Sequence, residues 1–280
     1  MPTFLAPDGT ELAYRVTGTG EPVLCLPGGP MRDSTYLGDL GGLAADLQLV
    51  LLDPRGTGQS AVPADLSTYR CDRMSGDVGA LADHLGLAGF RLLGHSAGAN
   101  LAVQYAAAHQ DRVSRLALIT PSTRAVGLEM TSDDRRAIME LRAGETWYAE
   151  AAAAFERAQV DGGTAADWAA MAPLLYGHWD ADMQAHWALD ADLDNAEAVR
   201  MYGSAGAFDP PALRAVLAAY DGDVLLYGGE LDINTSPPLV AAYAALFPAA
   251  SLVVQPGAGH FPWLDDPASF RVAVTSFLAG

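Results

Sequence analysis

Residues 94–98 read Gly94-His95-Ser96-Ala97-Gly98 and stand between a short apolar run, 90–93, and a run of small residues, 99–105, that favours a helix. A G-x-S-x-G pattern at a strand-to-helix corner makes a tight, strained turn, because the glycines keep side chains out of the way. The serine oxygen then points off the sheet edge, and the helix start supplies oriented N–H groups where negative charge is favoured. Such a pattern also arises by chance in a chain with 29 glycines, so its weight depends on partner residues elsewhere.

Composition narrows the class of protein. The chain has 280 residues, 50% of them hydrophobic, which is enough for one large core or for one domain with an insertion. Its formal charge is −18, from 34 acidic and 16 basic residues. This balance argues against a nucleic-acid partner, whose phosphates need basic patches, and against docking on an anionic membrane. We interpret the acidity as a property that favours solubility.

Cysteine usage and the first residues bear on the compartment. Cys25 lies in an apolar run and fits a buried strand, and two cysteines, Cys25 and Cys71, indicate neither a disulfide framework nor a metal cluster. The start of the chain lacks the basic and apolar regions of a signal peptide, and no apolar run is long enough to span a bilayer. We therefore expect a cytoplasmic protein.

Strand and helix patterns alternate through most of the chain. A turn sequence at Pro7-Asp8-Gly9-Thr10 predicts a hairpin over 3–17. The alternation predicts an α/β fold with a mainly parallel, eight-stranded sheet and helices on both faces. Further strands are expected at 23–26, 48–52, 90–93, 113–119, 224–227 and 251–255, and helices at 72–87, 97–109, 238–246 and 267–278.

The alternation stops between residues 121 and 219. This stretch is helical in character and rich in alanine, tryptophan and acidic residues, with breaks at Gly144, Gly162-Gly163, Pro173 and Gly203. We expect one core domain made of 1–120 and 220–280, and a helical insertion over 121–219 that forms a cap.

A nucleophilic serine needs a base and an orienting carboxylate, which follow in the order serine, acid, histidine in this type of fold. His260 is the one histidine after the last predicted strand, in a glycine-rich loop. The acid should follow the strand 224–227, where Asp232 is our choice and Glu230 the alternative. Taken alone, a loop histidine is usually an ordinary exposed residue, and a turn aspartate usually caps its own turn. Together they should meet Ser96 at the carboxyl edge of the sheet, with His95 as a wall residue.

Two N–H donors are needed for the oxyanion. One is the N–H of Ala97, next after the nucleophile. The other should come from the loop after the strand 23–26, where Pro27 and Pro30 have no N–H; Gly28 or Gly29 must supply it, and we choose Gly29.

With these residues in place, the whole chain resembles the α/β-hydrolases, and within them the proline iminopeptidase-like group. Pro27-Gly28-Gly29-Pro30 is similar to that group's H-G-G-P-G loop, and Asp53–Ser60 is similar to its D-x-R-G-x-G-x-S segment. The resemblance implies a helical cap, and an oxyanion hole formed by Gly29 and Ala97. The serine corner of iminopeptidases reads G-G-S-W-G, whereas His95 and Ala97 flank the serine here, which is closer to esterase-type members.

The predicted cap is the element expected to select substrate. Aromatic residues at helical spacing usually serve packing, but the underside of a cap must be apolar, and we take Trp179 and Trp187 as candidates for the pocket lining. Four acidic residues cluster in the same segment; a solvated face is the ordinary explanation for them. If the substrate carries an amine, Asp194 and Glu197 are its candidate ligands, one helical turn apart. The full cluster is Asp190, Asp192, Asp194 and Glu197.

The leading hypothesis is a cofactor-independent serine hydrolase, without a metal, that cleaves a small ester or amide with Ser96, His260 and Asp232. The alternative within enzymes is release of N-terminal proline from short peptides. The alternative outside enzymes is a small-molecule receptor that uses the same pocket. The expected partner is a small molecule or short peptide, and the sequence leaves the oligomeric state open.

Overall fold

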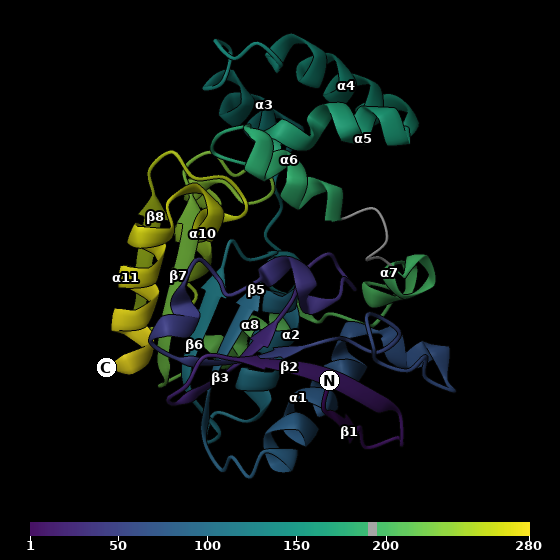
Figure 1. Cartoon of the computed structure of the whole chain (residues 1–280), viewed down its shortest axis with the longest axis vertical. Coiled ribbons are helices and arrows are strands. Elements are labelled where there is room, and N and C mark those ends of the chain that lie inside the picture. Colours follow the sequence, from purple (N-terminus) through teal and green to yellow (C-terminus); the bar gives the residue numbers. More distant parts are fainter. Residues whose placement is uncertain (190–194) are drawn as a thin grey trace.

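The computed structural model describes residues 1–189 and 195–280 and contains one eight-stranded sheet (Figure 1). From edge to edge its strands are β1 (Thr3–Leu5), β2 (Glu11–Thr17), β4 (Gln48–Leu52), β3 (Pro22–Leu26), β5 (Phe90–His95), β6 (Val113–Ile119), β7 (Asp223–Gly229) and β8 (Ala250–Gln255). The hairpin β1–β2 joins β4 in antiparallel pairing, and every pair from β4 to β8 is parallel. The predicted fold class is confirmed.

Both faces of the sheet are buried. Along β3, Leu24 and Leu26 join one hydrophobic cluster, with Val78 of α1, while Val23 and Cys25 join another. This alternation is the period of two that a strand covered on both faces requires. Helices α1 (Cys71–His84), α2 (Gly98–Ala108) and α9 (Pro237–Ala244) contribute to the first cluster, and α10 (Pro262–Asp265) and α11 (Pro267–Ala279) contribute to the second. Figure 1 shows α1, α2 and α11 beside the sheet.

The remaining helices follow β6 in sequence. Figure 1 shows α3 to α6 standing apart from the helices on the sheet faces. Helices α3, α4 and α5 carry a hydrophobic cluster of their own around Met139, Phe155 and Met171, whereas Met183 of α6 joins a cluster of the sheet. Tyr202 of α7 and Leu217 of α8 likewise belong to a cluster of the sheet. Within the predicted insertion, the cap is therefore best assigned to α3 (Ser132–Glu140), α4 (Tyr148–Asp161) and α5 (Ala165–Met171), with α6 (Ala181–Ala188) as the helix that joins it to the core through Met183. Helices α7 (Ala196–Tyr202) and α8 (Pro210–Leu217) pack on the core. No helix in the described ranges is long and apolar enough to cross a membrane.

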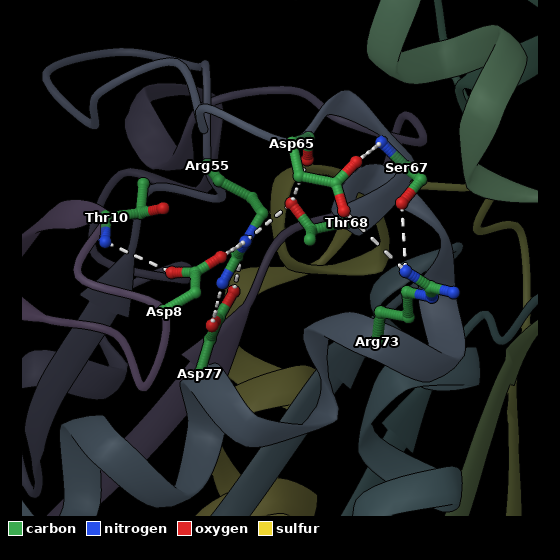
Figure 2. Close-up of polar contacts among 8 residues, drawn as sticks. All are labelled: Asp8, Thr10, Arg55, Asp65, Ser67, Thr68, Arg73 and Asp77. Atoms are coloured by element: carbon green, nitrogen blue, oxygen red, sulfur yellow. Dashed lines mark hydrogen bonds and ion pairs between the residues drawn. The ribbon is translucent and has the colours of Figure 1, made fainter.

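The Arg55 guanidinium, in the loop after β4, ties three segments together (Figure 2). It donates to both carboxylate oxygens of Asp77 on α1, at 2.8 and 2.5 Å, and also to Asp8 and Thr68, at 2.7 Å each. Arg55 is only 2% exposed. Burial tends to raise the pKa of the Asp8 carboxyl, but hydrogen bonds, above all from Arg55, outweigh it and lower that pKa to about 2. The segment that resembles D-x-R-G therefore fastens α1 to the loops beside it.

Replacing Asp77 by alanine should destabilise the fold, because the Arg55 charge would stay buried without its main partner. We expect a loss of about 3–5 kcal/mol in the free energy of unfolding, the usual effect of breaking a buried ion pair from one side. Urea unfolding followed by circular dichroism would measure it. Asp46→Ala, which breaks the exposed pair with Arg271, is the control and should change stability far less. Equal effects of the two substitutions would contradict the structural role of Arg55.

Candidate active site

Ser96 sits at the sharp corner between β5 and α2. Its backbone has φ = 51°, in the left-handed region where residues other than glycine are strained. The corner is closely packed: a Cβ on Gly94 would lie 2.8 Å from the Cα of Ala99, and one on Gly98 would collide with the carbonyl oxygen of Leu26. Both glycines are thus required for helix α2 to approach the sheet, and the tight turn expected at this pentapeptide is present.

Three residues from three loops form one chain of hydrogen bonds. His260, in the loop after β8, has its Nε2 atom 2.9 Å from the Ser96 hydroxyl and its Nδ1 atom 2.9 Å from the Asp232 carboxylate. Asp232 follows β7 and is fully buried, and its second oxygen accepts the N–H of Asn234 at 2.8 Å. The structure therefore brings together the serine, histidine and aspartate that the sequence singles out, at the carboxyl ends of the parallel strands.

The alternative acid, Glu230, lies elsewhere. It is exposed, and its carboxylate accepts the N–H of Gly257 at 2.7 Å. That bond caps the turn after β8, so Glu230 supports the histidine loop from outside, while Asp232 is the carboxylate in contact with His260.

The backbone of His260 is held from two sides. Its carbonyl oxygen accepts hydrogen bonds from Thr120 Oγ1 at 2.9 Å and from His95 Nε2 at 3.0 Å. Its N–H donates to the carbonyl of Leu175, which belongs to the segment between α5 and α6, at 2.7 Å. The base is therefore fastened both to the sheet and to the cap.

His95 is buried and belongs to a second hydrogen-bonded chain. Because its Nε2 donates to a carbonyl, its Nδ1 must accept, and it does so from the Tyr36 hydroxyl at 2.6 Å. That hydroxyl in turn accepts the N–H of Gly28 at 2.6 Å. Burial, followed by the nearby His260, lowers the pKa of His95 well below its usual value, which keeps the ring neutral in this role. His95, expected as a wall residue, thus connects three loops of the site.

The hydrogen bonds of Tyr36 distinguish between Gly28 and Gly29 as N–H donors to the oxyanion. The N–H of Gly28 is occupied by Tyr36, whereas the N–H groups of Gly29 and Ala97 donate to no acceptor within residues 1–189 and 195–280. Gly29 and Ala97 both line the cavity that holds Ser96. Ala97 also precedes the N-terminus of α2, an 11-residue helix whose dipole favours negative charge there.

A cavity of about 530 Å³ opens over Ser96 and His260. Three arginines line it, Arg32, Arg124 and Arg135, together with one glutamate, Glu129. These basic residues were not among the candidates predicted from the sequence, which were aromatic and acidic residues of the insertion. Arg32 directly follows the loop 27–30, and Arg124 and Glu129 follow β6, so their places after strand ends were a usable signal.

The four cap candidates have different positions. Trp187 lines a second cavity of about 510 Å³, which shares Leu175, Asn234 and Arg135 with the first. Trp179 packs on Tyr176, with ring centres 5.3 Å apart, and is absent from the described lining of either cavity. Glu197 is exposed on α7 and does not line the cavity over Ser96. Asp194, with Asp190 and Asp192, lies outside the described residues.

Comparison with known proteins shows relatives along the whole chain. A family model described as the alpha/beta hydrolase fold matches residues 21–267. The chain is 25% identical over 275 residues to a proline iminopeptidase of Heyndrickxia coagulans, with 93% of this chain and 91% of the relative covered. An esterase from Exiguobacterium antarcticum aligns with a TM-score of 0.75 and 21% identity over 99% of both chains. A proline iminopeptidase from Mycobacterium smegmatis aligns with a TM-score of 0.75 and 22% identity, over 99% of this chain and 98% of that one. At such identities the structural matches establish a shared fold and leave the substrate open.

Proposed function

Since this chain belongs to the α/β-hydrolase fold family, we propose that it is a serine hydrolase that cleaves a small ester or amide through an acyl-enzyme. The observation that supports this most directly is the hydrogen-bonded series Ser96–His260–Asp232, together with Gly29 and Ala97, whose N–H groups are available, in the lining of the same cavity. A receptor needs the cavity but has no use for a serine, a base and free donors in this arrangement.

Acylation would begin when Ser96 Oγ attacks the acyl carbonyl carbon. As the new C–O bond forms, the hydroxyl proton passes to His260 Nε2, and Asp232 stabilises the resulting imidazolium through Nδ1. The carbonyl oxygen gains negative charge and is bound by the N–H groups of Gly29 and Ala97. When the tetrahedral intermediate collapses, His260 returns the proton to the leaving group, and the bond to that group breaks.

Deacylation repeats these steps with water. His260 accepts a proton from water as the water oxygen attacks the acyl carbon, and the same two donors stabilise the oxyanion. The proton then returns to Ser96 Oγ as the acyl acid leaves. No group beyond these residues and water is needed for the cycle to balance.

The charges around the cavity favour a neutral or anionic substrate over a cationic one. An aminopeptidase must bind the ammonium group of its substrate, and a partly desolvated carboxylate is the usual ligand for it. Glu129 is the one carboxylate among the described lining residues, and it is exposed and faces the same cavity as three arginines. We therefore favour ester hydrolysis over release of N-terminal proline.

The purified protein should hydrolyse 4-nitrophenyl butyrate with a kcat/KM at least about 100-fold above that for prolyl-2-naphthylamide, because placing like charges together costs several kcal/mol. Steady-state rates on both substrates test this. If prolyl release is instead efficient and falls on Glu129→Gln while ester cleavage persists, the iminopeptidase alternative is correct. Tight binding of esters without turnover would point to a receptor.

A further inference from the structure

The distribution of basic residues in this chain is uneven. The sequence contains no lysine, so all 16 basic residues are arginines, and 34 acidic residues outnumber them about two to one. Most arginines elsewhere lie against carboxylates, as Arg55 does against Asp77 and Arg271 does against Asp46. Arg32, Arg124 and Arg135 line the cavity over Ser96, where Glu129 is the one acidic residue among the described lining residues. Neither Arg124 nor Arg135 has a carboxylate within 4.0 Å in the described part of the chain. An acidic protein that concentrates guanidinium groups at its candidate active site creates a local site for anions.

Arg135, on cap helix α3, is the most informative of the three. Its side chain is half-buried, and its Nη1 donates to the backbone carbonyls of Met130 and Thr131, at 2.5 and 3.4 Å. Within the described residues no carboxylate lies within 4.0 Å of it. Burial lowers the pKa of Arg135, which reflects the cost of keeping this cation partly out of water. The carboxylates of Asp134 and Asp232 act on this charge from a distance, but the hydrogen-bond partners of Arg135 are backbone carbonyls. A guanidinium has five N–H donors, so Arg135 can bind a further acceptor.

The next residue shows the opposite arrangement. Arg136 points to the surface and forms ion pairs with Glu156 and Asp133, at 2.7 Å each. The two adjacent arginines of α3 thus differ in their partners. Arg136 is neutralised by carboxylates of the protein, whereas Arg135 faces the cavity that Ser96 also lines.

We infer that the substrate carries a carboxylate besides the acyl group under attack, and that Arg135 binds this carboxylate, with Arg124 as a second cation that lines the same cavity. This inference rests on the proposed hydrolase function and specifies its substrate class. The planar fork of a guanidinium matches a carboxylate and can bind it through two parallel hydrogen bonds. Arg124 is exposed, and its side chain makes one hydrogen bond to the described residues, a long one of 3.4 Å to the carbonyl of Gly203.

Glu129 reduces the positive charge of the cavity. Its carboxylate lines the same cavity and repels anions. The attraction by the arginines and the repulsion by Glu129 both grow with the charge of the ligand, so these groups do not select the number of charges. The planar shape of a carboxylate, which matches the guanidinium fork, is the reason to choose it as the ligand.

The test compares two esters that differ only in this charge: mono-4-nitrophenyl adipate and its methyl ester. The wild-type protein should prefer the acid ester by about 10- to 100-fold in kcat/KM, the range for hydrogen bonds to a charged group. In Arg135→Gln this ratio should fall to near one, mainly through a higher KM for the acid ester. Arg135→Lys should restore part of the preference, because it keeps the charge but loses the fork.

Arg136→Gln is the matched control, since it removes the same charge from the same helix on the solvent side. It should keep the wild-type ratio. If wild type shows no preference for the acid ester, or if Arg136→Gln lowers the ratio as much as Arg135→Gln does, the carboxylate inference is wrong. Failure of the proposed function would look different: neither ester would be cleaved, or both would still be cleaved after Ser96→Ala.

Discussion

Replacing Ser96 by alanine should lower kcat for ester hydrolysis by a factor on the order of 10⁶, the usual effect of removing the nucleophile of a triad. The hydroxyl is the group 2.9 Å from His260 Nε2, and alanine leaves the base with nothing to activate. Since Ser96 is held at the corner by its backbone, with its N–H donating to the carbonyl of Ile119 at 3.0 Å, the fold should persist. Rates with 4-nitrophenyl butyrate would measure the loss of kcat, and circular dichroism spectra would show whether the fold persists.

A fluorophosphonate probe provides the control for this experiment. It should label wild-type protein at Ser96 alone, as shown by peptide mass spectrometry, and should leave the Ser96→Ala variant unlabelled. Labelling that survives the substitution, or hydrolysis that falls only a few-fold, would mean that another residue is the nucleophile.

Asp232→Asn should lower kcat by roughly 10⁴, because it forces His260 into the wrong tautomer. The N–H of Asn234 donates to one oxygen of Asp232, so an amide at this position must keep its oxygen there. Its NH₂ group then faces His260 Nδ1, which becomes an acceptor and leaves the proton on Nε2. In that state the ring cannot take the proton of Ser96.

Glu230→Gln is the matched substitution for this prediction. Glu230 lies two residues before Asp232, and its carboxylate accepts a hydrogen bond from the turn at Gly257. The change to glutamine should therefore reduce kcat by far less than Asp232→Asn does. Steady-state kinetics on the same ester would show which of the two variants loses more of its kcat. A larger loss in Glu230→Gln would assign the orienting carboxylate to Glu230 instead.

Much of the fold is predictable because local patterns and packing agree. The strand expected at 48–52 is β4 residue for residue, since its apolar run is bounded by turn sequences. The strand before Ser96 is two residues longer than expected. Gly94 and His95 extend β5 because both pair with β6, opposite Leu118 and Ile119. A pairing with a neighbouring strand is a property of the sheet, and the pentapeptide alone contains no sign of it.

The chain order of serine, acid and histidine was predictable because parallel strands deliver their carboxyl ends to one edge. The cap was harder. Whether Arg135 or Arg136 faces the cavity depends on how α3 sits over the sheet, and the two are neighbours of the same type in sequence. Trp187 likewise lines a cavity, while Trp179 packs against Tyr176. Composition identified the cap as a source of substrate contacts but not which side chains make them.

The contacts that run from Gly28 through Tyr36 and His95 to the carbonyl of His260 have a consequence for engineering. These hydrogen bonds make the three loops parts of one unit. A chimera that imports an iminopeptidase-type corner, with glycine in place of His95, would leave the Tyr36 hydroxyl without its acceptor and remove one of the donors to His260. Transplants into this scaffold should therefore exchange the corner together with the segment 27–36, so that donors and acceptors stay matched across the graft.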